Sequence, residues 1–230
     1  MEPLSEPHDP RHFAEDLAAL NRVLLEMAEL ARLRLDQAVR GLVNGDAAGL
    51  ERVIRSDEDV NRLQMEVDNR CFKMLALHQP VAVDLRLIVA AMKINDDLER
   101  VGDLAVNIAE AGRRYIGHAP VKPLIDLPRM AEIAGGMLRD AIKAFIAKDA
   151  ALCRDVLLRD DEVDALKDQI FRELLTYMLQ DPGTIEPALD LILISRHLER
   201  IGDHATNIAE DVIFIVSARD VRHHIADRPR

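Results

Sequence analysis

Residues 98–110 read LERVGDLAVNIAE, and residues 198–210 read LERIGDHATNIAE. The two stretches are identical at ten of their thirteen positions, and the shared Glu, Asp and Asn residues are among those that match. A long phrase that recurs within one chain indicates an internal duplication. In both copies apolar residues recur at three- and four-residue spacing, which is typical of an amphipathic helix. The repeat therefore predicts two similar helical halves.

The amino-acid composition favours a helical fold and argues against nucleic acid as a ligand. Hydrophobic residues make up 49% of the 230-residue chain, but aromatic residues make up only 3% and there is no Trp. The core must therefore consist mainly of Leu, Ile, Val, Ala and Met, which suits helices. The formal net charge of −11 repels phosphate backbones, and few aromatic rings are present on which bases could stack. Cations and basic protein surfaces suit this chain better.

The sequence predicts a cytoplasmic protein. Cys71 and Cys153 lie in unrelated apolar contexts, which is typical of buried thiols in a reduced compartment and not of a disulfide framework. No basic segment followed by an apolar stretch opens the chain. Apolar runs such as VIFIVSA at 212–218 are too short to span a bilayer.

Three helices are expected in the first half. Apolar residues at helical spacing run from about residue 12 to residue 43, and the sequence NGD at 44–46 ends this pattern. Asp46 is then placed to cap a second helix, which continues to about residue 78. Pro80 and Asp84 mark a turn, and a third helix extends from about residue 83 to residue 116.

The second half repeats this order. The segment GHAPVKPLIDLP at 117–128 contains three prolines and no helical period, so we interpret it as a linker. A fourth helix follows from about residue 130, and Asp149 is placed to cap a fifth helix that ends near residue 180. The turn DPGT at 181–184 leads into a sixth helix, which reaches about Ser217. The last dozen residues are expected to form a frayed tail.

Two offsets relate the halves. The tripeptide DAA occurs at 46–48 and at 149–151, an offset of 103 residues, whereas LER recurs at an offset of 100. The two offsets differ by three residues, and this difference falls in the loop before the third helix of each half, where insertions are tolerated. These observations predict an all-α fold of two tandem antiparallel three-helix bundles related by internal duplication. The expected domains are residues 1–117, a linker at 118–128, and residues 129–230, which include the tail.

The repeated phrase places acidic and amide residues on one face of each helix. At about 100° per residue, the apolar residues gather on one side and the carboxylates and amides gather on the other. This polar stripe contains Asp96, Glu99, Asp103, Asn107 and Glu110 in the first copy, and Arg196, Glu199, Asp203, Asn207 and Glu210 in the second.

A bound cation would explain why carboxylates lie four residues apart. Like charges at this spacing destabilise a helix by about 0.2–0.5 kcal/mol unless something neutralises them. Carboxylate and amide oxygens are the ligands that hard cations prefer. The alternative is an ordinary solvated face, in which Arg100 and Arg200 pair with Asp103 and Asp203 at i, i+3. Surface positions are free to differ between copies, so their match supports metal binding, although common ancestry would also explain it.

Two glycines and two histidines near the stripes have other interpretations. Because a glycine within a helix costs about 1 kcal/mol relative to alanine, Gly102 and Gly202 are interpreted as points where a neighbouring helix approaches closely. His197 and His204 share one flank of the sixth helix and have no counterpart in the third. They are interpreted as ordinary surface histidines.

The motif E-x-x-x-D followed by Asn, within LER[VI]GD-x-A-x-NIA, occurs once in each half. Together with VAVDLRLIVAAMKI at 81–94, it resembles the PhoU family, the accessory regulators of the phosphate-specific transport system. The resemblance covers nearly the whole chain and includes both copies of the motif.

The resemblance implies a cytoplasmic, non-enzymatic regulator that restrains phosphate uptake and the phosphate-starvation response when phosphate is plentiful. Its implied partners are the ATPase component of the phosphate ABC transporter and a sensor histidine kinase. Contact with these partners would hold the protein at the inner membrane without insertion, and the protein would be a homodimer.

The resemblance also implies metal binding, because family members hold divalent or ferric ions, in some cases as multinuclear iron clusters. Carried onto this chain, the ligand positions are Glu99, Asp103 and Asn107 in the first copy and Glu199, Asp203 and Asn207 in the second. Further acidic and amide positions lack an equally sharp motif and are not included, namely Asp59, Asn61, Glu162 and Asp164.

Two functions of other classes stay open at this point. Carboxylate-bridged di-metal enzymes also place acidic residues on long helices, but the Glu-x-x-His pairs of such enzymes are absent at every Glu of this sequence. Oxygen-dependent turnover by iron-loaded protein would favour the enzyme. A purely structural helical scaffold is the other alternative, and absence of metal after gentle purification would favour it.

Overall fold

The computed structural model describes residues 10–55 and 58–217, and every regular element in this part of the chain is a helix. The all-α prediction is therefore confirmed. The helices, in chain order, are α1 Pro10–Asn44, α2 Ala47–Ile54, α3 Glu58–His78, α4 Val83–Tyr115, α5 Asp126–Ala147, α6 Ala150–Gln180, the short 3-10 helix η1 Pro182–Thr184, and α7 Ile185–Ser217.

Two aspartates begin helices at equivalent places in the halves. The side chain of Asp46 accepts a hydrogen bond from the backbone N–H of Gly49 and caps α2. The side chain of Asp149 accepts from the backbone N–H groups of Ala151 and Leu152 and caps α6. Both caps satisfy donors that have no partner within the helix. The two predicted capping roles are confirmed.

The second helix of the first half is not continuous, contrary to the sequence prediction. A single helix was expected over residues 46–78, but α2 ends at Ile54 and α3 begins at Glu58. The polar sequence RSDED at 55–59 contains Ser and Asp, residue types that favour helix ends over helix interiors. In the second half the equivalent residues, 158–162, read LRDDE and continue α6 without interruption.

The helix after the linker begins earlier than expected. The linker was expected over residues 118–128, but α5 begins at Asp126. Pro128 is thus the third residue of α5, a position where proline is tolerated because the first N–H groups of a helix lack intrahelical partners. The expected frayed tail, the last dozen residues, lies outside the described residues.

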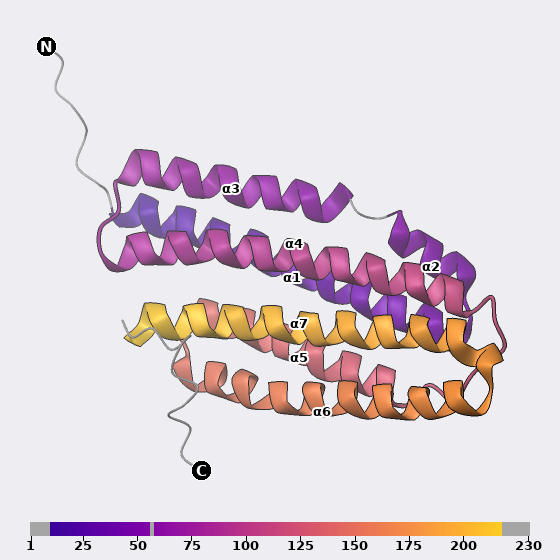
Figure 1. Ribbon diagram of the computed structural model, residues 1–230. Helices are drawn as coiled ribbons and strands as arrows, with labels where there is room; N and C mark the ends of the chain where they lie inside the picture. Colours follow the sequence, from indigo (N-terminus) through magenta and orange to yellow (C-terminus); the bar gives the residue numbers. More distant parts are fainter. Residues whose placement is uncertain (1–9, 56–57, 218–230) are drawn as a thin grey trace, which may run out of the picture.

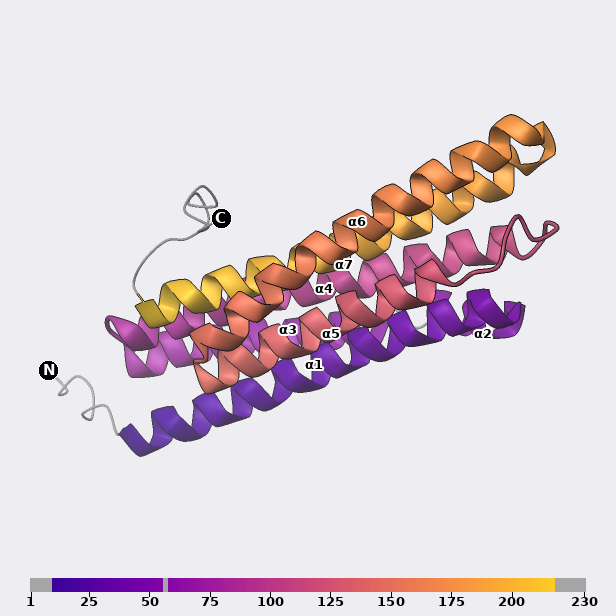
Figure 2. The same ribbon diagram turned by 90° about the horizontal axis from the view of Figure 1, so that it is seen from below.

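The helices form two layers (Figures 1 and 2). The front layer contains α3, α4, α7 and α6 in that order, and α1 and α5 lie behind α4 and α7. Helices α1, α3 and α4 pack together as one bundle, and α5, α6 and α7 pack together as the other. The two bundles meet along α4 and α7, which run antiparallel at the centre of the molecule, and along α1 and α5.

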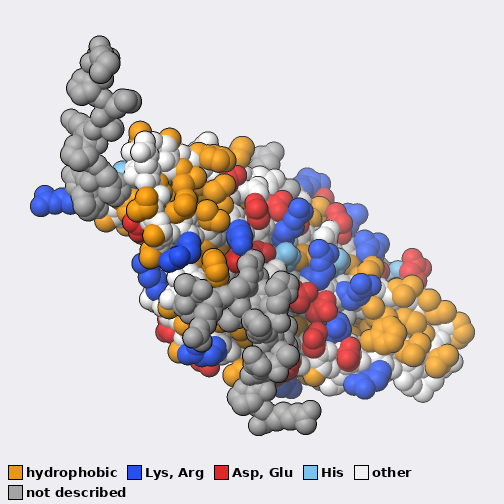
Figure 3. Space-filling model, turned by 60° about the vertical axis from the view of Figure 1, so that its left-hand side comes forward, with side chains coloured by type: hydrophobic (Ala, Val, Ile, Leu, Met, Phe, Trp, Pro, Cys, Tyr) orange, Lys and Arg blue, Asp and Glu red, His pale blue; other side chains and the backbone are white. Residues whose placement is uncertain are grey.

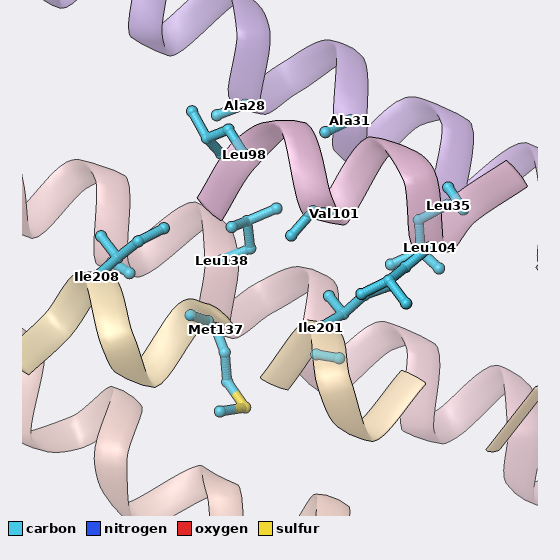
Figure 4. Close-up of a cluster of buried hydrophobic side chains, with 14 of the residues drawn as sticks. Ala28, Ala31, Leu35, Leu98, Val101, Leu104, Met137, Leu138, Ile201 and Ile208 are labelled. Carbon is cyan, nitrogen blue, oxygen red and sulfur yellow. The ribbon is translucent and has the colours of Figure 1, made fainter. Parts of the chain in front are cut away.

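One apolar core joins the two bundles. Buried side chains of α1, α4, α5 and α7 interdigitate at the centre, as Figure 4 shows for residues such as Leu35, Leu98, Leu138 and Ile201. The core consists mainly of aliphatic residues, as the composition predicts. Both motif helices are therefore held rigidly by packing on their apolar sides, and their polar stripes face outward.

Two further expectations concern the described residues. Cys71 and Cys153 are both free and fully buried, and burial raises the pKa of each thiol to about 12, so these thiols are unreactive. Among residues 10–55 and 58–217, no helix combines the length and the apolar character that crossing a bilayer requires.

Candidate functional site

Ionic contacts across α4 and α7 fix how the two motif helices face each other. Nζ of Lys93, near the start of α4, lies 3.1 Å from Oδ1 of Asp211, near the end of α7. Nη2 of Arg114, at the end of α4, lies 2.8 Å from Oδ1 of the buried Asp190. Because each pair joins the start of one helix to the end of the other, the two pairs fix the antiparallel packing of the motif helices.

The two histidines near the second motif are not surface residues, contrary to the sequence interpretation. His204 Nδ1 lies 2.8 Å from Oδ1 of Asp97, and both side chains are largely buried between α7 and α4. Burial, together with the neighbouring Arg200 and Arg196, lowers the pKa of His197. The helical wheel placed both histidines beside the stripe, but it carried no information about the neighbouring half of the chain.

The two motif glycines are points of close approach, as predicted. A Cβ atom built on Gly102 would lie 3.3 Å from Cγ1 of Val60 in α3. A Cβ atom on Gly202 would lie 3.5 Å from both Cγ1 of Val163 and Oδ1 of Asp160 in α6. Each glycine thus lets the outer helix of its bundle, α3 or α6, lie close to the motif helix. In the second copy, Glu199, one turn before Gly202, therefore lies at the seam between α7 and α6, where Lys167 contacts it.

In the first copy, an arginine lies beside the motif carboxylates. Arg100 Nε lies 3.6 Å from Oε2 of Glu99, and Arg100 Nη1 lies 3.7 Å from Oδ2 of Asp103. The i, i+3 pair of Arg100 and Asp103 was expected for a solvated face. The Glu99 side chain is only 21% exposed, whereas Asp103 is 40% exposed. Asn107 is exposed on the same stripe.

The second copy contains a denser group of carboxylates. Lys167 of α6 lies between them, with its Nζ 2.9 Å from Oε1 of Glu199 and 3.1 Å from Oδ1 of Asp164. The charges of Asp164, Asp203 and Glu199 act on Asp160, and those of Glu199 and Asp164 act on Asp203, so the four carboxylates lie near one another. We refer to Asp160, Asp164, Glu199 and Asp203 as the carboxylate cluster. Asn207 is exposed one turn beyond it.

Burial, and after it the neighbouring carboxylates, disfavour the charged form of two members of the carboxylate cluster. Burial, and then the charges of Asp164 and Asp203, raise the pKa of Asp160 to about 6. Burial, and then Glu199 and Asp164, also raise the pKa of Asp203. The hydrogen bond to Glu199 raises the pKa of Lys167. An ammonium group therefore supplies part of the compensation that a bound cation would supply.

The donor chemistry of the carboxylate cluster suits a hard cation, although the side chains do not form a closed ligand set. Four carboxylates from two helices offer oxygen ligands to such an ion. In the part of the chain that the structure describes, no three His, Cys, Asp or Glu side chains converge as metal ligands. Lys167 takes the place of a cation beside Glu199 and Asp164, so an ion would have to displace its ammonium group.

The sequence interpretation missed two members of this site. Asp160 and Lys167 were not selected, and Asp164 was noted but not included. The sequence does contain a signal for Asp160. Asp57 lies 103 residues earlier, so an aspartate recurs at the offset that relates the two halves. Of the other positions set aside, Glu162 pairs with Arg129 and Asp59 lies near Arg62, so neither joins the carboxylate cluster.

Comparison with known proteins agrees with this architecture. A family model described as the PhoU domain matches residues 24–112 and again residues 127–212. A protein from Caulobacter vibrioides is 37% identical over 215 residues, which cover 93% of this chain and 94% of that protein. A protein from Aquifex aeolicus is 39% identical over 215 residues, which cover 93% of this chain and 97% of that protein. Both are named phosphate-specific transport system accessory protein PhoU homolog.

Solved structures show the same fold. The crystal structure of PhoU from Pseudomonas aeruginosa matches with a TM-score of 0.86 at 35% identity, over 90% of this chain and all of that one (100%). The phosphate transport system regulatory protein PhoU from Streptococcus pneumoniae matches with a TM-score of 0.83 at 26% identity, over 91% of this chain and 99% of that one. Since the domain occurs twice and the relatives match along nearly their whole length, this chain belongs to the PhoU family.

Proposed function

We propose that this chain is an accessory regulator of phosphate transport that restrains phosphate uptake and the starvation response when phosphate is plentiful. The observation that carries the proposal is the match of the PhoU domain to both halves of the chain, together with relatives named as accessory proteins of phosphate-specific transport. These names describe accessory and regulatory proteins, which supports a role in binding partners and not in catalysis.

The proposed partners are the ATPase component of the phosphate ABC transporter and a sensor histidine kinase. The protein would contact them at the cytoplasmic side of the membrane through its folded surface. Its net charge of −11 supports contact with basic protein surfaces over contact with anionic lipids. The homodimer expected from the resemblance stays a prediction.

The carboxylate cluster is the proposed metal site of the second copy. Glu199 and Asp203 would bind the ion together with Asp160 and Asp164, and Asn207 adjoins them. In the first copy Glu99 and Asp103 would bind the ion, and Asn107 adjoins them. A bound divalent or ferric ion would neutralise the carboxylates and hold the motif helix to the outer helix of its bundle. The same proposal covers a multinuclear iron cluster bound at these carboxylates in place of a single ion.

Deletion of the gene in the source organism tests the regulatory proposal. Loss of the protein should raise alkaline phosphatase activity and phosphate uptake in phosphate-rich medium, because the restraint on both would be gone. Complementation with the wild-type chain should restore low activity, and a strain that carries only the empty vector is the control.

If the deletion strain and its parent show the same phosphatase activity and the same uptake, the regulatory proposal is wrong. A second gene of the same family could mask the effect, so the strain must lack every copy. Elemental analysis of gently purified protein tests the metal proposal separately, and protein with no bound metal would count against that part alone.

A further inference from the structure

The charged face in Figure 3 does not single out a ligand. Lys and Arg side chains lie among Asp and Glu side chains across its middle, and apolar side chains gather toward both ends. Neither sign of charge dominates, so charge alone selects no partner for this face. A hollow between α1 and α5 is lined by residues whose chemistry is more definite.

This hollow follows the seam where α1 and α5 lie side by side (Figure 2). It has a volume of about 380 Å³, which is within the range of small-molecule pockets. On α5 it extends from Pro128 to Arg139, about 16 Å along the helix axis. The seam joins the two bundles, and ligand pockets are common at such junctions. The charged residues that line the hollow are Arg32, Asp36, Arg40, Glu132 and Arg139.

Gly136 also lines the hollow, and no neighbouring helix requires a glycine there. A glycine within a helix is less favourable than an alanine. A Cβ atom built on Gly136 would lie 3.5 Å from Nη1 of Arg159 and 3.7 Å from Nη2 of Arg139, which are ordinary contacts with the ends of flexible side chains. The missing side chain therefore leaves space on the surface of α5 next to two guanidinium groups.

The two guanidinium groups beside Gly136 keep donors for a ligand. Nη2 of Arg159 donates to Oδ2 of Asp140 over 2.8 Å, and Nε donates to the backbone oxygen of the exposed Asp155 over 3.3 Å. Arg139 contacts Asp140 through Nε, at 3.4 Å. Within the described ranges, Nη1 of Arg159 and Nη2 of Arg139 have no hydrogen-bond partner. Guanidinium groups with free N–H donors are the usual ligands of phosphate oxygens.

Positive charge exceeds negative charge around Asp140. Nζ of Lys143 lies 3.9 Å from Oδ1 of Asp140, so three cations share this one carboxylate. The opposite holds on α1, where the guanidinium of Arg32 contacts both Glu29 and Asp36, each at 2.6 Å. The positive excess therefore lies on the α5 side of the hollow. It suits a phosphate monoester, which carries a charge of about −1.5 to −2 at pH 7.

Glu132 supplies an acceptor in the same hollow. It lies one helical turn from Gly136, about 6 Å along α5. Neither Glu132 nor Arg40, which lines the hollow from α1, has an ion-pair partner in the part of the chain that the structure describes. A carboxylate accepts hydrogen bonds and cannot donate them, so Glu132 suits a hydroxyl or amino group and repels a bare anion. The hollow therefore favours a phosphate that carries hydroxyl groups over inorganic phosphate.

The first half of the chain does not repeat this arrangement. At the offset of 103 residues, Gly136 corresponds to Leu33, Arg139 to Asp36 and Asp140 to Gln37. Both halves form the same bundle, so the fold does not require a glycine followed one turn later by an arginine at these positions. The arrangement is specific to one side of the seam, as expected of a single binding site.

We propose that the hollow between α1 and α5 binds a small phosphate ester that carries hydroxyl groups, namely a sugar phosphate or a nucleoside monophosphate. The phosphate group lies against Gly136 and accepts hydrogen bonds from Arg139 and Arg159. Glu132 accepts a hydrogen bond from a hydroxyl group of the ligand. The site is distinct from the two acidic stripes, which lie on α4 and α7.

Isothermal titration calorimetry of the purified full chain tests the site with glucose 6-phosphate and adenosine monophosphate. EDTA is present, so that no ester binds through a metal ion at the motifs. At least one ester should bind, and inorganic phosphate, glucose and adenosine should each bind on the order of tenfold more weakly or worse, because each lacks one of the two contacts.

Four variants locate the binding. Gly136→Leu fills the space beside the arginines, and Arg139→Gln removes the charged donor, so each should weaken ester binding on the order of tenfold or more. Leucine favours a helix more than glycine does, so Gly136→Leu should stay folded, which circular dichroism checks. Glu132→Gln should weaken ester binding and strengthen inorganic phosphate binding. Arg129→Gln is the matched control, because Arg129 pairs with Glu162 over 2.7 Å outside the hollow, and it should bind like the wild type.

Several results would overturn the site. They are no binding of either ester, inorganic phosphate bound as tightly as the esters, Gly136→Leu or Arg139→Gln with wild-type affinity, an unchanged preference in Glu132→Gln, and an equal loss in Arg129→Gln and Arg139→Gln, which would indicate attraction by charge alone. The measurement uses the purified protein without partners, so its outcome is independent of the regulatory proposal.

Discussion

Lys167 of α6 donates a hydrogen bond from Nζ to Oε1 of Glu199 in α7, over 2.9 Å. The same ammonium group lies 3.1 Å from Oδ1 of Asp164. Both contacts lie at the seam where α6 packs beside the second motif. Lys167 therefore links the outer helix to the motif helix and compensates carboxylates that would otherwise repel each other. In the first half the equivalent residue is Gln64, which carries no charge.

Replacement of Lys167 by Gln should destabilise the metal-free protein. The substitution leaves the carboxylate cluster without its ammonium group, and we expect a loss of about 1 kcal/mol in the free energy of unfolding, given partial exposure of the pair. Added metal should stabilise the variant more than the wild type, since the ion no longer competes with an ammonium group. Urea denaturation with and without metal measures both effects.

Lys143→Gln is the matched control for Lys167→Gln. Lys143 is 59% exposed and its Nζ lies 3.9 Å from Asp140, outside the carboxylate cluster. Its replacement should change neither the stability nor the response to metal. Equal responses to metal in the Lys167 variant, the control and the wild type would show that Lys167 does not occupy a cation site.

Replacement of Asp160 by Asn should change how stability depends on pH. The folded-state pKa of Asp160 is raised from 3.8 to about 6, mainly by burial. The folded protein therefore holds this proton more tightly than the unfolded chain, so the contribution to stability is complete below about pH 4 and is lost as the pH rises through about 6. The Asn side chain at this position is neutral at every pH, so the variant lacks this loss of stability. The variant should be more stable than the wild type near pH 7, by about 1 kcal/mol after discounting for solvent screening.

Urea denaturation between about pH 5 and pH 8 checks this dependence. The advantage of the Asn variant should shrink as the pH falls toward 5. Asp59→Asn provides a comparison, since Asp59 is 65% exposed and lies near Arg62, and it should give a curve parallel to that of the wild type. A constant difference between Asp160→Asn and wild type across the range would contradict the raised pKa.

The fold was predictable because the determining signals are local. Apolar spacing indicated the long helices, and Asp46 and Asp149 indicated where two of them begin. The break between Ile54 and Glu58 was not predicted, because the apolar period continues through it at Val53 and Val60. A helical period shows which residues share a face, but it does not show where a helix ends.

The site was predictable in part, because only one of its two helices carries a motif. Glu199 and Asp203 share a helix face at a fixed spacing, so a helical wheel finds them. Asp160 and Lys167 reach the same seam from α6, and their nearness to the motif depends on how two helices pack. The pairing of His204 with Asp97 depends on packing between the halves, which no local pattern encodes.

The two motif glycines should respond differently to alanine. Alanine gains up to about 1 kcal/mol in helix propensity over glycine. At Gly202 the added Cβ would meet its neighbours at 3.5 Å, an ordinary contact, whereas at Gly102 it would lie 3.3 Å from Cγ1 of Val60. Gly202→Ala should therefore raise the thermal midpoint, and Gly102→Ala should change it less because Val60 must move. A larger rise in the thermal midpoint for Gly102→Ala than for Gly202→Ala would show that α3 moves aside more easily than α6.

The amide variants Asp103→Asn and Asp203→Asn test the two metal sites. Each substitution removes a charged ligand while the near-isosteric side chain preserves the helix. The carboxylate cluster around Asp203 has four carboxylates beside one cation, Lys167, whereas the first copy has the two motif carboxylates beside Arg100, which lies 3.7 Å from Asp103. We therefore expect the second copy to bind metal more tightly, and Asp203→Asn to lose more metal than Asp103→Asn.

The two losses should add in the double variant, because the stripes lie on different helices and face different outer helices, so they share no ligand. Elemental analysis of the wild type, both single variants and the double variant measures this, and melting curves recorded alongside show that each protein is folded. For a solvated face without metal, all four proteins would have the same metal content, and Asp203→Asn would be slightly more stable because it relieves repulsion from Glu199 and Asp164. That combination of results would reject metal binding at both motifs.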